Sequence, residues 1–145
     1  VFGDQLVISE KDDILDEEEI LLVQGVGYSV DEVALEAKGR GGLVILAHID
    51  RPSFSYTAVL GPIPSSFPAD ALEISWRCSS EEVEVLREEY PEWTFIRSSD
   101  SHWLRSLCVE NCSVFLLVEP TFDEIAKAIR KEDGRCVIGP WPNYF

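Results

Sequence analysis

Asp100 and His102 are the residues of this sequence whose types and spacing most readily suggest chemistry. They stand two positions apart in Ser98-Ser-Asp-Ser-His102, directly after the strand-length segment Thr94-Phe-Ile-Arg97. Side chains two residues apart leave the same side of an extended chain. We therefore expect this carboxylate and this imidazole to reach one ion, or two adjacent ions, together.

The second histidine, His48, also follows an apolar run, Leu43-Val-Ile-Leu-Ala47. In parallel α/β folds, ligands gather beyond the C-terminal ends of the strands, so we expect His48 to approach Asp100 and His102. Imidazole and carboxylate ligands together suit zinc, manganese or iron, whereas calcium takes oxygen ligands. A single histidine is more often a structural residue than a ligand, and it is the two strand ends that favour a metal site here.

Strands and capped helices alternate along the chain and would position these residues. The alternation favours an α/β fold with mainly parallel strands, because parallel neighbours need crossover connections. The stretch 9–19 is acidic and is expected to be a solvated turn, since its aspartates lack the spacing of a calcium loop. The stretch 50–68 is rich in Pro, Ser and Gly and is expected to be a long functional loop. Apolar runs predict strands at 5–8, 43–47, 71–75, 94–97, 114–118 and 136–138, and capping sequences predict helices that start near 29, 79 and 121.

Composition narrows the classes of protein. With 145 residues, 46% of them hydrophobic, the chain can bury one substantial core and is expected to be a single domain. The net charge of −15 disfavours nucleic-acid binding, because a phosphate backbone would be repelled. No apolar run approaches the roughly 20 residues that span a bilayer, so we expect a cytoplasmic protein without a membrane partner. Cys108 and Cys112 could suggest metal or redox chemistry, but ordinary thiols are favoured because no second pair accompanies them.

Two segments resemble motifs of the PHP (polymerase and histidinol phosphatase) family of metal-dependent hydrolases. The stretch Gly41-Gly-Leu-Val-Ile-Leu-Ala-His-Ile-Asp-Arg-Pro52 looks like the family motif in which a strand ends in Ala-His. The stretch Ser98-Ser-Asp-Ser-His102 looks like its Ser-Asp-x-His motif. The segments at 2–6, 60–64 and 71–74 are similar to the family's spacing between motifs, so the resemblance covers the chain from about Val1 to the helix at 122–130.

The resemblance implies a distorted, TIM-like β/α barrel with up to three metal ions at the strand C-termini, acting on a phosphorylated small molecule. It implies that His48, Asp100 and His102 are metal ligands and that Asp100 is the catalytic residue. Arg51 would contact the substrate phosphate, or would form a structural salt bridge instead. Glu73 would support a ligand from behind or be a surface carboxylate, and Trp103 is expected at the mouth of the site.

The sequence departs from the PHP pattern in its ligands. The family's His-x-His motif, its Asp-His pair and its further Glu and His ligands are not present, and the chain has only two histidines and no Met. We therefore expect residues 1–145 to be the C-terminal half of a PHP domain, inactive alone and completed from elsewhere. The alternative is a non-catalytic half-barrel scaffold or interaction module. Exposed sheet edges would in either case favour a homo-oligomer.

Overall fold

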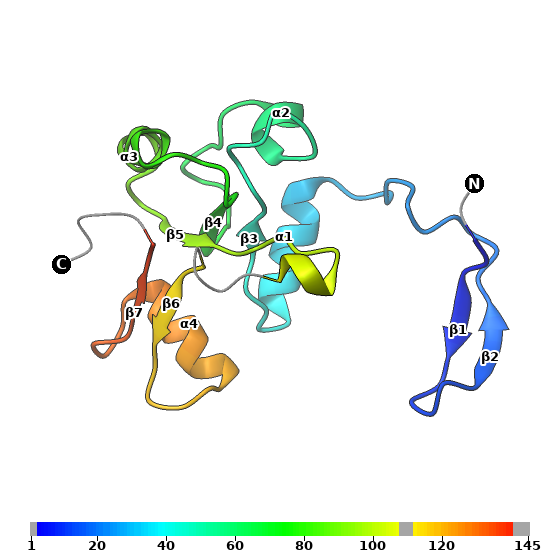
Figure 1. Ribbon diagram of the computed structural model, residues 1–145. Helices are drawn as coiled ribbons and strands as arrows, with labels where there is room; N and C mark the ends of the chain where they lie inside the picture. The colour runs from blue at the N-terminus through cyan, green and yellow to red at the C-terminus, as the bar shows by residue number, and fades with distance from the viewer. Residues whose placement is uncertain (1–2, 108–111, 141–145) are drawn as a thin grey trace. The chain divides into compact units, whose positions relative to one another are not determined.

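The computed structural model describes residues 3–107 and 112–140, and the chain divides into two units, 1–30 and 31–145. The first unit is a β-hairpin, and the second combines a parallel sheet of three strands, helices and an antiparallel pair of strands (Figure 1). Within the described residues, no helix is both long and apolar enough to cross a membrane.

The hairpin of the first unit consists of β1 (Leu6–Ile8) and β2 (Ile14–Glu17), which pair antiparallel. Its turn is held by Ser9, whose Oγ accepts hydrogen bonds from two backbone N–H groups of the turn. The expectation of a turn over the whole acidic stretch 9–19 is wrong, because β2 lies inside it. The charged residues of β2 tolerate the strand because none of the described residues 3–30 is buried.

The second unit is built on a parallel sheet of three strands in the order β3 (Ile45–Leu46), β4 (Ala71–Ile74) and β5 (Thr94–Arg97). Parallel strands separated by helices confirm the expected α/β class. Strand β3 is shorter than the apolar run that predicts it. The N–H of Val44, just before β3, donates to the carboxylate of Asp70 at 2.8 Å instead of to a neighbouring strand.

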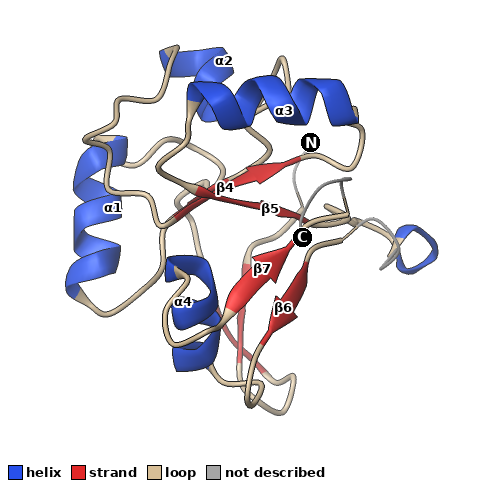
Figure 2. Ribbon diagram, turned by 90° about the vertical axis from the view of Figure 1, so that its left-hand side faces the viewer, coloured by secondary structure: helices blue, strands red, loops and turns tan. Residues whose placement is uncertain are grey.

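The predicted capping box before helix α3 (Ser80–Glu89) is confirmed. Ser79 Oγ accepts from the N–H of Glu82, and the Glu82 carboxylate accepts from the N–H of Ser79 at 2.8 Å, which lowers the pKa of Glu82. In Figure 2, α3 lies over β4 and β5.

The expectation of a loop throughout 50–68 is wrong in part, because α2 lies within it. The described helices are α1 (Val30–Gly39), α2 (Tyr56–Leu60), α3 (Ser80–Glu89), the short 3₁₀ helix η1 (Leu104–Ser106) and α4 (Phe122–Arg130).

The last two strands, β6 (Val114–Leu116) and β7 (Cys136–Ile138), pair antiparallel. Parallel pairing in the described residues is therefore confined to β3, β4 and β5, and the expectation of mainly parallel strands holds for that sheet alone. Strand β6 is also not the buried strand that its apolar run predicts, since Val114 and Leu116 are exposed. Helix α4 packs against this strand pair and shares with the parallel sheet a core of Ala71, Ala128, Ile129 and Val137.

A buried ion pair fixes the start of α4 to the loop before β7. Both oxygens of the Glu124 carboxylate accept from Arg135, at 2.8 and 3.0 Å, and one also accepts from the N–H of Val118. The hydrogen bonds from Arg135 and Val118 lower the pKa of Glu124 from 4.5 to about 2. This carboxylate therefore stabilises the fold fully above about pH 4.5, and that contribution is lost as the pH falls toward 2.

We predict that Glu124→Gln lowers the melting temperature by several degrees at pH 7, because Arg135 keeps its charge and loses its partner. The difference from the wild type should shrink as the pH falls from 4.5 toward 2, where the native carboxylate is itself protonated. Thermal unfolding followed by circular dichroism across this range measures it. Glu119→Gln, on an exposed side chain, is the matched control. A constant difference at all pH values would contradict the assignment.

Candidate functional site

A carboxylate, a guanidinium and an imidazole meet beyond the C-terminal ends of the parallel strands. Asp100 lies shortly after β5, and its Oδ2 accepts a hydrogen bond from Nη1 of Arg51 at 2.9 Å. Its other oxygen, Oδ1, lies 3.5 Å from Nε2 of His102. Arg51 comes from the segment after β3. The structure therefore brings together three of the four residues that the sequence singles out.

The reason that Asp100 and His102 meet differs from the expected one. The backbone at Asp100 is left-handed, with φ of 46°, so the segment is not the extended chain that the two-residue spacing suggested. Aspartate is among the few residue types that adopt this conformation readily. The two side chains are neighbours because the chain turns at Asp100.

Two adjoining cavities open at this point. The first, the polar cavity, has a volume of about 550 Å³, and its lining includes Asp50, Arg51, Ser75, Cys78 and Glu82. The second, the tryptophan cavity, has a volume of about 540 Å³, and its lining includes Ser99, Trp103, Ser106 and Cys112. The two cavities share Trp76, Arg77, Asp100 and His102. Asp100 and His102 thus face two spaces of the size that ligand sites commonly have.

His48 is not brought into either cavity as a lining residue. It lies in a turn just after β3, with a positive φ of 34°, and its backbone N–H donates to Oε2 of Glu73 at 3.3 Å. Its Nδ1 is buried and has no hydrogen-bond partner in the described part of the chain. A buried nitrogen without a partner is costly, so a ligand or ion is one way to satisfy it.

Two carboxylates, Glu73 and Asp50, connect the ends of the parallel strands through hydrogen bonds. The sequence suggested at most a supporting role for Glu73 and did not indicate Asp50. Glu73 of β4 receives the His48 N–H on one oxygen and the hydroxyl of Ser98, which follows β5, on the other. Asp50 accepts hydrogen bonds from both the N–H and the hydroxyl of Ser75 at the end of β4. The position of Asp50, two residues after the histidine, was the one available signal. Glu73 is therefore a half-buried carboxylate that links the segments after β3 and β5, and not a plain surface carboxylate.

The spacing of Asp100 and His102 fits two ligands of one metal ion. Ligand bonds of about 2.0–2.2 Å in a tetrahedral site place neighbouring donor atoms about 3.4 Å apart. The observed 3.5 Å between Oδ1 and Nε2 matches this, whereas a direct N–H···O hydrogen bond would be about 2.7–3.2 Å long. The fit covers two ligands only, since the described residues contain no cluster of three or more His, Cys, Asp or Glu that could hold an ion.

Cys78, in the polar cavity, is a neutral thiol and not a nucleophile. Burial, together with the negative charges of Asp50 and Glu82, raises the pKa of Cys78 to about 11. The thiolate is the reactive form of cysteine, so this thiol is inert at neutral pH. The polar cavity thus offers guanidinium and carboxylate groups for binding and no sulfur chemistry.

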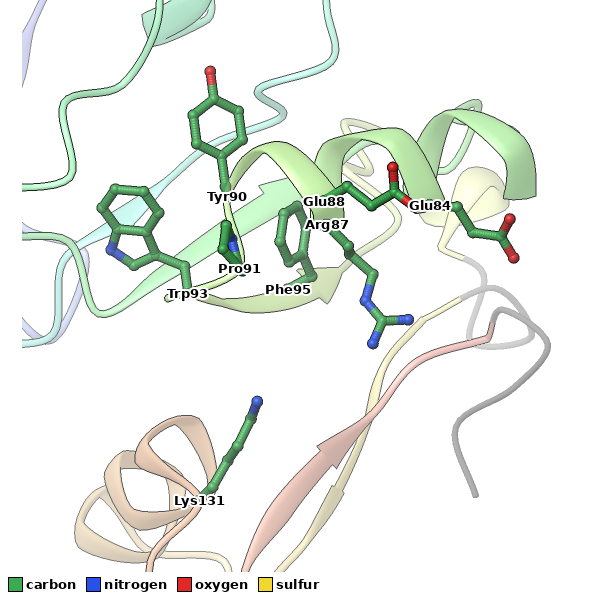
Figure 3. A pocket seen from close by; sticks show the side chains of 8 residues that line it. All are labelled: Glu84, Arg87, Glu88, Tyr90, Pro91, Trp93, Phe95 and Lys131. Carbon is green, nitrogen blue, oxygen red and sulfur yellow. The ribbon is translucent and has the colours of Figure 1, made fainter.

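A third cavity, of about 400 Å³, lies between α3 and the end of α4 and contains none of the predicted site residues (Figure 3). Its lining mixes the opposite charges of Glu84, Glu88, Arg87 and Lys131 with the aromatic rings of Tyr90, Trp93 and Phe95. Those three aromatic residues are buried and belong to the core. We therefore place the candidate site at the polar and tryptophan cavities.

The remaining sequence motif, Cys108 with Cys112, cannot be placed as a pair because Cys108 lies outside the described residues. Trp103 borders the tryptophan cavity, as expected for a residue at the mouth of the site.

Comparison with protein-family models, with curated proteins and with solved structures finds no match to this chain.

Proposed function

We propose that this chain is part of a metal-dependent phosphoester hydrolase of the PHP type, folded as the C-terminal portion of a distorted β/α barrel. Asp100 and His102 would hold a divalent ion, zinc, manganese or iron, and Arg51 would contact the phosphate of a small-molecule substrate. The observation that carries the proposal is the 3.5 Å spacing of Asp100 Oδ1 and His102 Nε2 at the border of the polar cavity. Such a hydrolase would work in the cytoplasm.

His48 is proposed as a further ligand on separate grounds. Its buried Nδ1 needs a partner, and Glu73 holds the backbone of His48 in a fixed position. A histidine whose surroundings fix its orientation is a better ligand, since less freedom is lost on binding. Two histidines do not complete a cluster of three ions, so catalysis requires ligands from outside these 145 residues. The chain alone would hold one ion through Asp100 and His102 and would be inactive.

The chain's own residues would divide the work of phosphate hydrolysis. When bound, the ion would lower the pKa of a water molecule toward neutrality and offset charge on the phosphoryl oxygens. Arg51 would hold a phosphate oxygen, and without an ion the carboxylate of Asp100 would compete with the phosphate for the Arg51 guanidinium through its 2.9 Å contact. The local positive charge also explains how a protein of net charge −15 could accept an anionic substrate.

Metal binding by the purified chain tests the proposal. We expect Zn²⁺ to bind with a stoichiometry of one in isothermal titration, and His102→Ala to weaken binding at least about tenfold. The His102 side chain is 79% exposed, so its removal should leave the fold intact, which circular dichroism checks.

Equal Zn²⁺ affinity in the wild type and in His102→Ala would reject His102 as a ligand. The absence of any binding would favour the second candidate function, a non-catalytic scaffold or interaction module. One observation supports that candidate: the hairpin of the first unit exposes the large apolar side chains Leu6, Val7, Ile8, Ile14 and Leu15. A scaffold that self-associates through this hairpin would sediment as an oligomer.

A further inference from the structure

The third cavity, between α3 and the end of α4, lies at the opposite end of β5 from the candidate site. Trp93, which lines this cavity, directly precedes β5, whereas Asp100 follows the C-terminal end of that strand. A strand rises about 3.3 Å per residue, so β5 separates the two places by roughly 10 Å or more. The cavity is therefore distinct from the proposed metal and phosphate sites, and its ligand is not the proposed substrate.

Two cationic side chains enter this cavity from opposite sides. In Figure 3, Arg87 of α3 and Lys131 at the end of α4 extend toward each other across the gap. The carboxylates of Glu84 and Glu88 lie on the side of Arg87 away from Lys131. Lys131 forms no ion pair with any described residue, although the chain has 27 acidic and only 12 basic side chains. Two positive charges that face one space repel each other, so an anion between them is stabilised by both.

The backbone at Lys131 supports a role for its side chain. Lys131 ends α4 in the left-handed conformation, with φ of 58°, where helices most often have glycine. A residue with a Cβ atom is strained in this conformation, and strain of this kind clusters at functional positions. The chain thus has a lysine where glycine would be more stable, and the ammonium of that lysine reaches the cavity.

Two aromatic side chains form a fixed wall beside these cations. The rings of Tyr90 and Trp93 lie 6.0 Å apart between centroids, and the polar atom of each ring is hydrogen-bonded to the backbone of another segment. We propose that the third cavity binds a small aromatic carboxylate, with its carboxylate between Arg87 and Lys131 and its ring against this wall. A volume of about 400 Å³ suits such a ligand, and charge-assisted hydrogen bonds hold a carboxylate strongly.

Calorimetric titration of the full chain with benzoate tests this site, with benzamide and acetate as comparisons. We expect benzoate to bind in the millimolar range or more tightly. Benzamide should bind at least about tenfold more weakly because it is neutral, and acetate likewise because it has no ring. Lys131→Gly should weaken benzoate binding at least about fivefold and yet raise the melting temperature, since glycine adopts the left-handed backbone without strain. Lys131→Asn, whose new residue also tolerates that backbone, should lose affinity to the same extent.

Two control variants should keep the benzoate affinity of the wild type. Lys11→Gly removes the same charge from the exposed turn of the first hairpin, and Arg51→Ala removes a cation of the polar cavity. Benzoate affinity no greater than that of benzamide or of acetate, no benzoate binding in the millimolar range, or full affinity in the two Lys131 variants would overturn the inference. Loss of affinity in Arg51→Ala would also overturn it, because benzoate would then bind in the polar cavity.

Discussion

Phe95→Ala is expected to lower the free energy of unfolding by about 3–5 kcal/mol, a large part of the roughly 5–15 kcal/mol that stabilises a domain. Phe95 lies in β5, beside Leu72 of β4, and is 2% exposed. Removal of its ring takes away contacts on the buried face beneath α3 and leaves a void next to the third cavity, which the ring borders. Chemical denaturation followed by circular dichroism measures the loss.

The matched control is Phe54→Ala, which removes the same atoms from a side chain that is 85% exposed. The left-handed backbone at position 54 disfavours phenylalanine and alanine alike, because both carry a Cβ atom. Phe54→Ala therefore removes an exposed ring and changes nothing else at that position. We expect the control to change stability by less than about 0.5 kcal/mol. A loss of under about 1 kcal/mol for Phe95→Ala would mean that the surroundings collapse into the third cavity and that this part of the core is loosely packed.

The elements that the sequence predicts best are those whose signals are local. Strand β5 is found at the residues that its apolar run indicates, and α3 begins at the predicted Ser79 cap. Strand β2 was missed because its two apolar residues, Ile14 and Leu15, lie within an acidic stretch and form too short a run to indicate a strand. The antiparallel pairing of β6 with β7 was also not predicted, because mainly parallel strands were expected. An apolar run indicates a strand but does not specify its partner, and β7 comes from a segment beyond α4.

The sequence predicted which residues form the candidate site better than it predicted how their side chains are arranged. Asp100 and Arg51 were each singled out, and their ion pair is the salt bridge that the sequence reading kept as one of two roles for Arg51. The orientation of His48 could not be predicted, because it depends on a left-handed residue after a strand only two residues long. Arg77 gave no signal, and the sequence did not distinguish Trp76 from the other tryptophans as core or pocket wall, since it is the turn after β4 that brings both residues to the cavities.

Asp100→Asn should change two affinities in opposite directions. Loss of the carboxylate removes a ligand charge, so we expect Zn²⁺ binding to weaken about a hundredfold. The same change releases Arg51 and removes a negative charge beside the polar cavity. Two unit charges about 4 Å apart interact by about 1 kcal/mol in water, so metal-free binding of inorganic phosphate should strengthen by roughly fivefold. Calorimetric titration of each ligand measures both effects.

Asparagine is the right replacement because it has the shape of aspartate and readily adopts the left-handed backbone that Asp100 requires, whereas alanine would add strain. Asp12→Asn makes the same change at another left-handed aspartate, in the exposed turn of the first hairpin, and should alter neither affinity. Unchanged Zn²⁺ affinity in Asp100→Asn would exclude Asp100 as a ligand. Unchanged phosphate affinity would mean that the Arg51 guanidinium does not serve the phosphate, and its ion pair with Asp100 would then be structural alone.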